Sequence, residues 1–500
     1  MGDGRHEGPP LPTPRHDAPT RFEPTDLPAG FADRLAQVCP TVTTEPGDLA
    51  EAGRDWWPLS INWAAGGELP ARPGVIARPS TTAEVAAVVG LCNSERVPVT
   101  AAGGRSGVCG SAVPVHGGVS LDTTGLVGIE AVDDDSLLLQ VWSGTYGDDL
   151  ERDLRANHGV TLGHWPQSMA LSTVGGWLAC RSAGQYSNRY GKIEDMVMGL
   201  EVVLADGSVI RTGGRGPRSA SGPDLNQLFV GSEGTLGVIT RSTLRVHPLP
   251  ASEQRSAWSF SSFAEGLAAC RRMLRRGATP AVQRLYDHRE SKQNFDIEDR
   301  HVLIILDEGD PAIVDATMSI AAEECRDGQR EDDALVERWL GHRNDVSGLG
   351  SAISQGLVVD TCEIAGPWAM LPGLYEAAVE AVKAVPGAWT ASAHQSHAYL
   401  DGACLYFTFA GQREDDTDGL YREAWDAITN ATLERGGALS HHHGIGLNRA
   451  RFMQEALGDS FHTLVAIKAA LDPNGILNPG KLGLPTPFGD GVVWLAGGAV

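Results

Sequence analysis

The chain has 500 residues, with 63 acidic side chains against 40 lysines and arginines, so its formal charge is −23. Such a charge repels nucleic acids and anionic membrane surfaces over long distances, and we expect neither as a partner. The chain is too long for one hydrophobic core and predicts two to four domains of roughly 150 residues, and its 61 glycines exceed the roughly 7% of an average protein.

The N-terminal segment is rich in proline over residues 1–28, which predicts a mobile or surface-bound arm. The first forty residues lack the apolar core of a signal peptide, and no stretch approaches about 18 uninterrupted apolar residues, so we expect no integral membrane segment. The eight cysteines include no CxxC pair and are expected as reduced thiols, which favours a cytoplasmic location.

Helical and strand patterns alternate at short spacing from about residue 72 to residue 250, which predicts an α/β or α+β domain. Thr81 and Glu84 have capping-box spacing and predict the start of a helix. Further along, the patterns predict strands at 97–102, 136–141 and the end of 232–246, a helix at 148–157 closed by Gly159, and a hairpin at 201–210.

A second α+β domain is expected after Pro250, where the sequence pattern changes. Amphipathic helices are expected near 262–276, 312–326, 373–385 and 419–436, separated by strand patterns such as 301–306 and 403–410. From Ser440 onward the chain is again loop-like with apolar positions, and we expect it to fold back onto the first domain.

Three loops combine glycine with hydroxyl side chains, at 102–110, 163–185 and 231–240. Successive N–H groups in such a loop form a concave anion site, and the missing side chains let a phosphate approach the backbone. No helix opens on a GxGxxG motif here, and GxxxxGK[ST] is absent, which excludes the Rossmann fingerprint and the common nucleotide loop. A turn without a ligand is the alternative for each loop, but three in one domain favour a large polar cofactor.

The set resembles the FAD-binding domain of the vanillyl-alcohol oxidase (PCMH-type) superfamily, from about Arg72 to Lys481. GHWPQSMALSTVGGWLACRSAGQYSNRYGKIEDM, AHQSHAYLDGACLYFTFAG and LSHHHGIG are more similar to alkylglycerone-phosphate synthase and its bacterial FAD-linked oxidase relatives than to the glycolate and D-lactate dehydrogenase branch. The resemblance implies an α+β fold with a two-subdomain FAD-binding domain (56–250) and a substrate (cap) domain with an antiparallel sheet (251–440). An arm and lead-in (1–55) precede them, and a C-terminal segment (441–500) returns to the FAD domain.

The resemblance implies that these loops bind FAD, which we expect to be non-covalent as in the most similar relatives. The pyrophosphate loop would comprise Thr100, Ala101, Ala102, Gly103, Gly104, Arg105 and Ser106. The flavin would be lined by Pro166, Gln167, Ser168, Ser172, Cys180, Arg181, Ser182 and Ala183. The rest of FAD would contact Glu233, Gly234, Thr235, Gly237, Val238 and Ile239, with Lys481 in a returning segment for which a plain turn is the alternative. A covalent link to His116, His164 or Cys180 is also conceivable.

The triplet His441, His442 and His443 is the most conspicuous local feature. Adjacent side chains on a strand point to opposite faces, so at most His441 and His443 could share an ion, and we expect no metal. Solvated or packed histidines are the other alternative. The resemblance places the triplet by the substrate and flavin, which suits proton transfer by His442 and His443 and a substrate-binding role for His441.

Two more candidates depend on the same resemblance. Tyr406 lies on an alternating strand, where a buried tyrosine is usually a hydrogen-bonded core residue, but the family has its active-site tyrosine here, so Tyr406 is the leading acid/base candidate. Arg284 matches a functional arginine of the family and suits an anionic substrate or the flavin edge, with a surface salt bridge as the alternative. His394 and His397 are expected to bind substrate.

One departure from the synthases bears on the reaction. Their substrate-binding arginine corresponds by spacing to Leu349, and Arg343 is the nearest arginine, which argues against a lipid-precursor substrate. Among three hypotheses we therefore favour an FAD-dependent oxidoreductase that oxidises a small hydroxyl- or amine-bearing substrate by hydride transfer to flavin N5. The alternatives are a redox-neutral synthase-like transferase acting through a flavin N5 adduct and a non-catalytic flavin-binding protein. We also expect a homodimer and a small-molecule substrate with anionic character.

Overall fold

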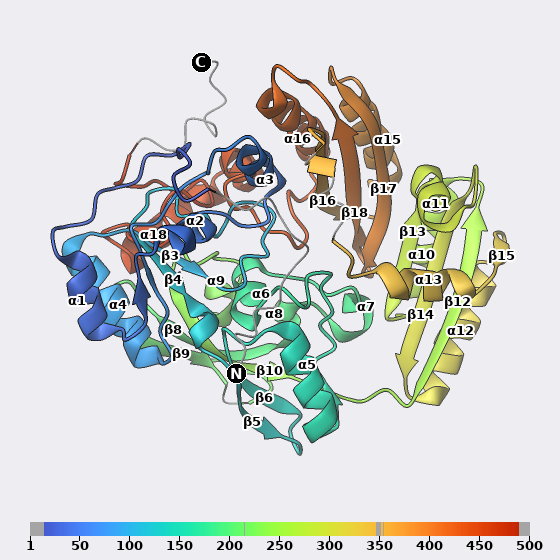
Figure 1. The fold of residues 1–500 in the computed structure, drawn as a ribbon. Helices are drawn as coiled ribbons and strands as arrows, with labels where there is room; N and C mark the ends of the chain where they lie inside the picture. The colour runs from blue at the N-terminus through green and yellow to red at the C-terminus, as the bar shows by residue number, and fades with distance from the viewer. Residues whose placement is uncertain (1–14, 215, 347–351, 354, 490–500) are drawn as a thin grey trace.

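The computed structural model describes residues 15–214, 216–346, 352–353 and 355–489 (Figure 1). The first sheet has four strands in the order β1-β2-β4-β3, and all but the β1–β2 pair are parallel. Its elements are α1 (Phe31–Val38), β1 (Val42–Thr43), α2 (Pro46–Ala52), α3 (Pro58–Ala65), β2 (Val75–Ala77), α4 (Thr82–Glu95), β3 (Val99–Ala102), β4 (Val119–Asp122) and a 3₁₀ turn (Thr123–Gly125). The Thr81 hydroxyl accepts a hydrogen bond from the N–H of Glu84, which fixes the start of α4 as the capping pattern predicts.

The second sheet is antiparallel, with five strands in the order β5-β6-β10-β8-β9. Its strands are β5 (Ile129–Asp133), β6 (Leu138–Trp142), β8 (Val197–Val203), β9 (Val209–Gly213) and β10 (Val238–Arg245). The other elements here are α5 (Gly147–Asp153), a π-helical turn (Leu154–His158), α6 (Val174–Cys180), α7 (Ser187–Tyr190), α8 (Ile193–Met196), α9 (Asn226–Phe229) and the pair β7 (Val160–Thr161) and β11 (His247–Pro248). Gly159, with φ +66°, ends the α5 segment.

A seven-stranded antiparallel sheet, here called the cap sheet, follows in the order β15-β12-β14-β13-β17-β18-β16. Its strands are β12 (Ser252–Phe260), β13 (Val282–Tyr286), β14 (His301–Gly309), β15 (Gln329–Glu331), β16 (Val358–Pro367), β17 (Ala388–Ala398) and β18 (Gly402–Gly411). The helices of this region are α10 (Phe263–Arg275), α11 (His288–Phe295), α12 (Pro311–Glu324), α13 (Ala334–His342), α15 (Leu371–Lys383) and α16 (Thr417–Leu433). Helices α10, α12, α15 and α16 pack against one face, and the fold is the α+β arrangement that the sequence predicts.

The alternation of side chains along β18 divides the cap sheet into a core face and a cavity face. Leu405, Phe407 and Phe409 are buried in the core under the helices, whereas Tyr406 and Thr408 between them line a cavity. The β18 strand therefore presents a polar row to the first domain while its apolar row stabilises the cap.

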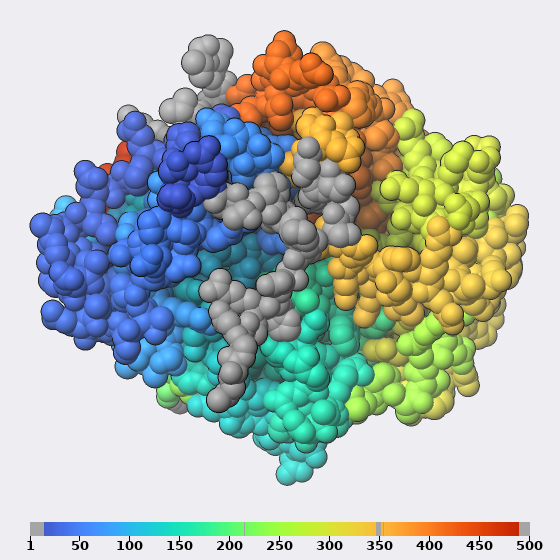
Figure 2. All heavy atoms as spheres, in the orientation of Figure 1, coloured from blue at the N-terminus to red at the C-terminus, as the bar shows by residue number. Residues whose placement is uncertain are grey.

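Both ends of the described chain lie against the first domain. In the N-terminal segment, Thr20 bridges to Leu69 and Thr25 to Gly117, so residues 20–25 follow the surface. The C-terminal part contains a 3₁₀ turn (Ala450–Phe452), α17 (Met453–Leu457) and α18 (Ser460–Leu471), and Leu477 then forms a parallel bridge to Val99 of β3. The space-filling view shows the early blue-to-teal segments and the later yellow-to-orange segments on opposite sides of one face (Figure 2).

All eight cysteines are free, and only Cys180 is partly exposed. Within the described residues, no helix is both long enough and apolar enough to cross a bilayer.

Candidate active site

A cavity of about 720 Å³ lies between the glycine loops and the polar face of the cap sheet. The predicted cofactor residues that line it are Ala101, Ala102, Gly103, Gly104, Arg105, Ser106, Pro166, Gln167, Ser168, Ser172, Cys180, Ser182, Ala183, Glu233, Gly234, Gly237, Val238 and Ile239. The predicted catalytic and substrate residues that line it are Arg284, His397, Tyr406, His442 and His443. Segments more than 300 residues apart thus meet at one site.

The loop after β3 has the donor set that a diphosphate requires. In the described part of the chain, none of the N–H groups of residues 104–108 donates a hydrogen bond to the protein. The guanidinium of Arg105 donates to the Ser120 hydroxyl at 3.1 Å, and its Nε is buried without a partner. Unpaired backbone donors beside a cation favour an anionic group, so these residues fit the phosphates of a dinucleotide.

Glycine is required in this loop because atoms of the neighbouring segment 171–173 come very close. A Cβ on Gly103 would lie 2.2 Å from Oγ1 of Thr173, and one on Gly104 would lie 1.9 Å from the carbonyl oxygen of Leu171. The loop after β3 therefore packs directly against residues 171–173, which also line the cavity. This close approach explains why two glycine-rich segments far apart in sequence form one continuous wall.

Four predicted cofactor residues do not line the cavity. Thr100 is buried within β3, and Thr235 donates from its hydroxyl to the carbonyl oxygen of Ser232 at 2.7 Å. Arg181 is an exposed, left-handed residue at the end of α6, and it pairs with Glu194 at 3.3 Å. These side chains turn away because they serve the loop's own structure.

Lys481 is the fourth of these residues, and it has a structural role. Its Nζ is fully buried and donates to the carbonyl oxygen of Val113 at 2.6 Å. Burial lowers the pKa of Lys481 to about 7, against the opposing charges of Asp55 and Glu233. Lys481 thus supports the loop behind the cavity wall.

The segment 440–446, here called the histidine loop, is held by the buried carboxylate of Glu363 on β16. Glu363 accepts hydrogen bonds from the Ser440 hydroxyl at 2.7 Å, from the N–H of His443 at 2.9 Å and from the N–H of His441. Arg449 Nη1 donates to the same carboxylate at 2.8 Å. Burial raises the pKa of Glu363, but Arg449 and the neighbouring histidines outweigh burial and hold it well below its ordinary value.

Glu233 holds the other end of the histidine loop from the first domain. Its carboxylate accepts from the N–H of Ile445 at 2.6 Å and from the N–H of Gly446 at 2.8 Å. Gly444 has φ +81°, and a Cβ there would lie 2.5 Å from Glu233 Oε1, so only glycine fits this turn. Burial raises the pKa of Glu233.

Tyr406, His442 and His443, the predicted acid/base group, line the cavity together. The Tyr406 hydroxyl donates to Oγ1 of Thr361 at 3.0 Å, and its ring lies 5.4 Å from the His443 ring, edge on. Burial raises the pKa of Tyr406, so this hydroxyl keeps its proton. Burial lowers the pKa of His442 to about 3 and that of His443 to about 4, so both rings are neutral at neutral pH and can accept a proton.

Arg284 on β13 is positioned by a neutral histidine. Its Nη2 lies 2.5 Å from Nε2 of His394, whose Nδ1 lies 2.7 Å from Oε2 of Glu290. A guanidinium only donates, so His394 accepts at Nε2 and donates from Nδ1 to Glu290. Burial, followed by the charge of Arg284, lowers the pKa of His394, which agrees with the neutral form. His394 therefore lies behind Arg284 and outside the cavity wall, while the buried Nε of Arg284 has no partner among the described residues.

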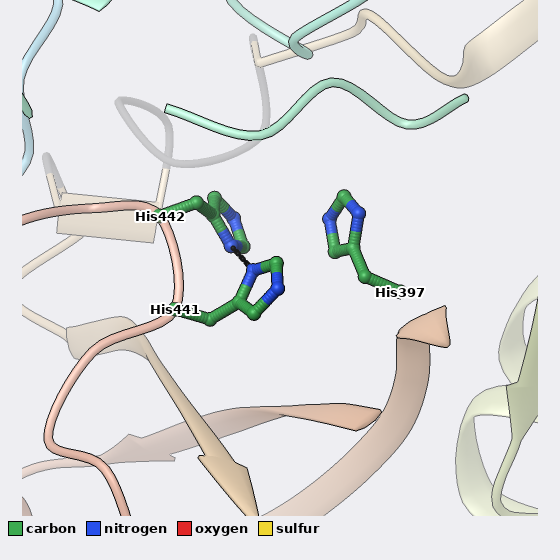
Figure 3. A group of neighbouring side chains, drawn as sticks. All are labelled: His397, His441 and His442. Carbon is green, nitrogen blue, oxygen red and sulfur yellow. Dashed lines mark hydrogen bonds between the residues drawn. The ribbon is translucent and has the colours of Figure 1, made fainter. Parts of the chain in front are cut away.

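His397, His441 and His442 converge on one point (Figure 3). The Nδ1 atoms of His441 and His442 are 3.1 Å apart, and the rings of His397 and His441 stack at 4.7 Å. The strand geometry that would let only His441 and His443 share an ion is not observed, because residues 440–446 form a loop and neighbouring rings can turn toward each other. His441 does not line the main cavity but lies behind His442.

Two family models match the chain in succession. Residues 73–213 match the FAD binding domain, and residues 249–482 match the C-terminal domain of FAD linked oxidases. An FAD-linked oxidoreductase of Escherichia coli O157:H7, YgcU, is 32% identical over 82% of this chain and 89% of its own length. This chain belongs to the FAD-linked oxidase family.

Other relatives are consistent with this membership. The alkyldihydroxyacetonephosphate synthase of Dictyostelium discoideum is 30% identical over 84% of this chain and 74% of that protein. A solved structure of alkyldihydroxyacetonephosphate synthase superposes with a TM-score of 0.77 at 24% identity, and the match covers 94% of this chain and 89% of that chain. The structure of p-cresol methylhydroxylase superposes with a TM-score of 0.73 at 18% identity, and the match covers 94% of this chain and 100% of that chain. This FAD-linked oxidase is an enzyme with a PCMH-type FAD-binding domain.

The side chains that could bind flavin covalently in this FAD-linked oxidase differ in their access to the cavity. Cys180 lines it, but burial, followed by the charge of Glu233, raises the pKa of its thiol to about 12. His164 is fully buried, 3.2 Å from the Ser182 hydroxyl, and His116 is also buried; neither lines the cavity. The one accessible candidate is therefore a protonated thiol, which is a poor nucleophile.

The arginine that distinguishes the synthases has no counterpart in the described lining of the cavity. Leu349 lies outside the described residues, and Arg343 is absent from the cavity wall. The Arg343 guanidinium lies instead over the rings of Tyr186 at 5.0 Å, Trp165 at 5.4 Å and Trp339 at 5.7 Å. Near the histidines, Arg284 is the cation that reaches the cavity.

Several site residues were missed in the sequence because their partners are distant. Glu363 contacts Arg449, 86 residues away, and Glu290 contacts His394, 104 residues away. Asp360 lines the cavity, accepts from Nε1 of Trp425 at 2.9 Å, and has its pKa raised to about 7 by burial. A usable signal existed only for Asp360 and Glu363, which are acidic residues within an otherwise apolar strand pattern.

Proposed function

We propose that this enzyme oxidises a small hydroxyl- or amine-bearing substrate, with FAD bound non-covalently as the hydride acceptor. The observation that carries the proposal is a single cavity lined both by unpaired backbone donors and by the neutral acid/base group of Tyr406, His442 and His443. The unpaired N–H groups of residues 104–108 and the Arg105 guanidinium would hold the diphosphate of FAD. When bound, FAD supplies two-electron chemistry, and the protein supplies orientation and proton transfer.

The protein's own side chains would bind the substrate and transfer its proton. Arg284, held by His394, would bind an anionic group of the substrate through the part of its guanidinium that lines the cavity and would fix the substrate's orientation. His442 or His443 would accept the proton of the substrate hydroxyl or amine at a ring nitrogen. Tyr406 keeps its proton and would turn it from Thr361 to the substrate oxygen as a hydrogen bond. The cap sheet would shield this group, whose side chains are only partly exposed, from bulk water.

A redox-neutral transferase resembling alkyldihydroxyacetonephosphate synthase is the second candidate, and 30% identity to such an enzyme favours it. The lining of the cavity favours oxidation, because Arg343 is engaged with aromatic rings and the described residues near the histidines offer Arg284 alone for a phosphate. A substrate with one small anionic group fits this lining better than a phosphorylated lipid precursor.

Anaerobic mixing of the FAD-loaded enzyme with small alcohols, amines and 2-hydroxy acids tests the proposal. We expect at least one compound to bleach the oxidised flavin band in a single turnover. Turnover of an acyl-dihydroxyacetone phosphate with a fatty alcohol, without bleaching by any compound of the panel, would support the transferase instead. Acid precipitation tests non-covalent binding: the yellow colour should remain in the supernatant, and colour in the pellet would contradict it.

A further inference from the structure

A second cavity, of about 390 Å³, lies behind the histidine loop. It is lined by residues 187–192, Asp195, Met196, Arg245, His247 and Tyr399. Arg245 and Asp195 are exposed, so this cavity reaches the surface of the protein. Its lining shares no residue with that of the main cavity, so the two cavities have separate walls.

A continuous chain of hydrogen bonds joins the two cavities. It starts at His442 in the main cavity, whose Nδ1 lies 3.1 Å from Nδ1 of His441 (Figure 3). His441 Nε2 lies 3.0 Å from the Tyr399 hydroxyl, which lies 3.0 Å from the Ser187 hydroxyl. Ser187 in turn lies 2.9 Å from Nδ1 of His397, which lines the main cavity again. Tyr399 and Ser187 line the second cavity.

The hydrogen bonds of this chain can all be made with one consistent order of donors and acceptors. His442 donates from Nδ1 to Nδ1 of His441, and His441 donates from Nε2 to the Tyr399 oxygen. Tyr399 then donates to Ser187, and Ser187 donates to His397. His441, Tyr399 and Ser187 each use one donor and one acceptor, and Nε2 of His442 keeps its lone pair.

We propose that His441 and Tyr399 relay the substrate proton from His442 to the second cavity, where Tyr399 releases it to solvent. The inference rests on the proposed oxidation, in which bound FAD would supply the two-electron chemistry and Nε2 of His442 would take up the substrate proton. His442 passes its Nδ1 proton to His441, His441 passes its Nε2 proton to Tyr399, and Tyr399 turns its own proton from Ser187 to a solvent molecule in the second cavity. One proton enters and one departs, and no group of the relay is oxidised or reduced.

The electrostatics of the buried rings make onward transfer necessary. Burial lowers the pKa of His441 and of His442 to about 3, so neither ring can keep a proton at neutral pH. Burial raises the pKa of Tyr399, which therefore carries a hydroxyl proton at all times and can only exchange it. A proton taken from the substrate must move on, and Tyr399 is the first group of the chain that lines the second cavity.

The charged groups around Tyr399 are largely compensated. Lys192 Nζ lies 4.7 Å from the centre of the Tyr399 ring and pairs with Asp195 at 2.6 Å. Arg189 pairs with Asp307 at 2.8 Å, and Arg245 donates to the carbonyl oxygen of Asp195 at 2.7 Å. The two ion pairs, Lys192 with Asp195 and Arg189 with Asp307, reduce the positive potential that a departing proton meets.

The substitution Tyr399→Phe tests the relay because it removes the hydroxyl and keeps the ring. In a single anaerobic turnover followed with a pH-indicator dye, we expect proton release about tenfold slower than in the wild type, with a larger solvent deuterium isotope effect. Tyr190→Phe is the matched control, since Tyr190 lines the same cavity but donates to Glu308 at 2.6 Å outside the chain. The control should release its proton at the wild-type rate.

Unchanged proton release and an unchanged isotope effect in Tyr399→Phe would overturn the relay, provided that flavin content and unfolding midpoint match the wild type. If this variant does not fold, His441→Gln gives the same comparison, because its amide cannot relay a proton by tautomer exchange. If no compound reduces the flavin at all, the proposed oxidation fails, and nitrogen-15 NMR of the resting protein still tests the relay. We expect the proton of His441 on Nε2 and that of His442 on Nδ1, and the opposite pair would overturn the relay.

Discussion

Glu233 and Glu363 both accept hydrogen bonds from backbone N–H groups of the histidine loop, but they come from different domains. Glu363, on the cap sheet, shares its site with the guanidinium of Arg449, and its pKa is lowered. Glu233, beside the glycine loop, has backbone N–H groups as its nearest donors, and burial raises its pKa. The cap side of the site is thus anchored by a compensated ion pair, and the flavin side by a carboxyl group that is costly to ionise.

Two different anchors place the histidine loop between the two domains. The ion pair fixes the end with His441 and His443 through a strong, charge-assisted contact. The other end is fixed by two backbone bonds and by the glycine at 444, and a buried negative charge there lies close to the predicted cofactor loop. Substitutions on the two sides should therefore change the free energy of unfolding by different amounts and with different pH dependence.

Removing Arg449 should have the largest effect. The side chain is 1% exposed, and Arg449→Met leaves the Glu363 carboxylate buried without its cation, which costs roughly 3–5 kcal/mol of the free energy of unfolding. Denaturant unfolding followed by tryptophan fluorescence measures this loss. Arg276→Ala, which breaks an exposed ion pair with Glu323, is the control and should leave the unfolding midpoint unchanged. Equal midpoints for both variants would contradict the anchoring role of the pair.

Tyr406→Phe should give the next largest effect, on catalysis and not on stability. The variant keeps the ring that stacks on His394 at 4.9 Å but loses the hydroxyl that faces the cavity. We expect flavin reduction to slow about 10²-fold with unchanged flavin content. Stopped-flow absorbance under anaerobic conditions measures the rate, and a rate equal to that of the wild type would remove Tyr406 from the acid/base group.

The acid dependence of stability should separate the two carboxylates. The pKa of Glu363 is lowered on folding, so its contribution is present above the unfolded-state value of about 4.3 and is lost as pH falls below it. Glu363→Gln should therefore be less stable near pH 7 but should lose less stability between about pH 5 and pH 3 than the wild type. Parallel losses in the two proteins over this range would contradict the lowered pKa.

Glu233→Gln should have the smallest effect. The amide oxygen can still accept one of the two backbone bonds, so we expect a loss of about 1 kcal/mol near neutral pH. Because the pKa of Glu233 is raised on folding, its ionisation opposes folding as pH rises above about 4.3, and this part of the pH dependence should disappear in the variant. Unfolding curves at several pH values measure both changes, and a loss as large as that of Arg449→Met would erase the difference between the two sides.

Local chemistry made much of the fold predictable. The capping pattern at Thr81 predicts the start of α4, and Gly159 predicts the end of the α5 segment, because the residues that decide these points are neighbours in sequence. The alternation along β18 correctly indicates one face toward the core. The pairs that hold the site join distant residues, such as Glu363 with Arg449, and no local pattern encodes them. The role of Lys481 was also not predictable from local sequence: the motif indicates that its segment returns to the first domain, but not that its side chain points away from the cavity.

The most direct test of the account is a crystal structure of the FAD-loaded enzyme with an oxidisable small molecule or its product. The account predicts the diphosphate of FAD against the backbone of residues 104–108 and the flavin ring beside Tyr406 and His442, with the small molecule in contact with Arg284. A flavin ring remote from Tyr406 and His442, or FAD bound outside the 720 Å³ cavity, would contradict it.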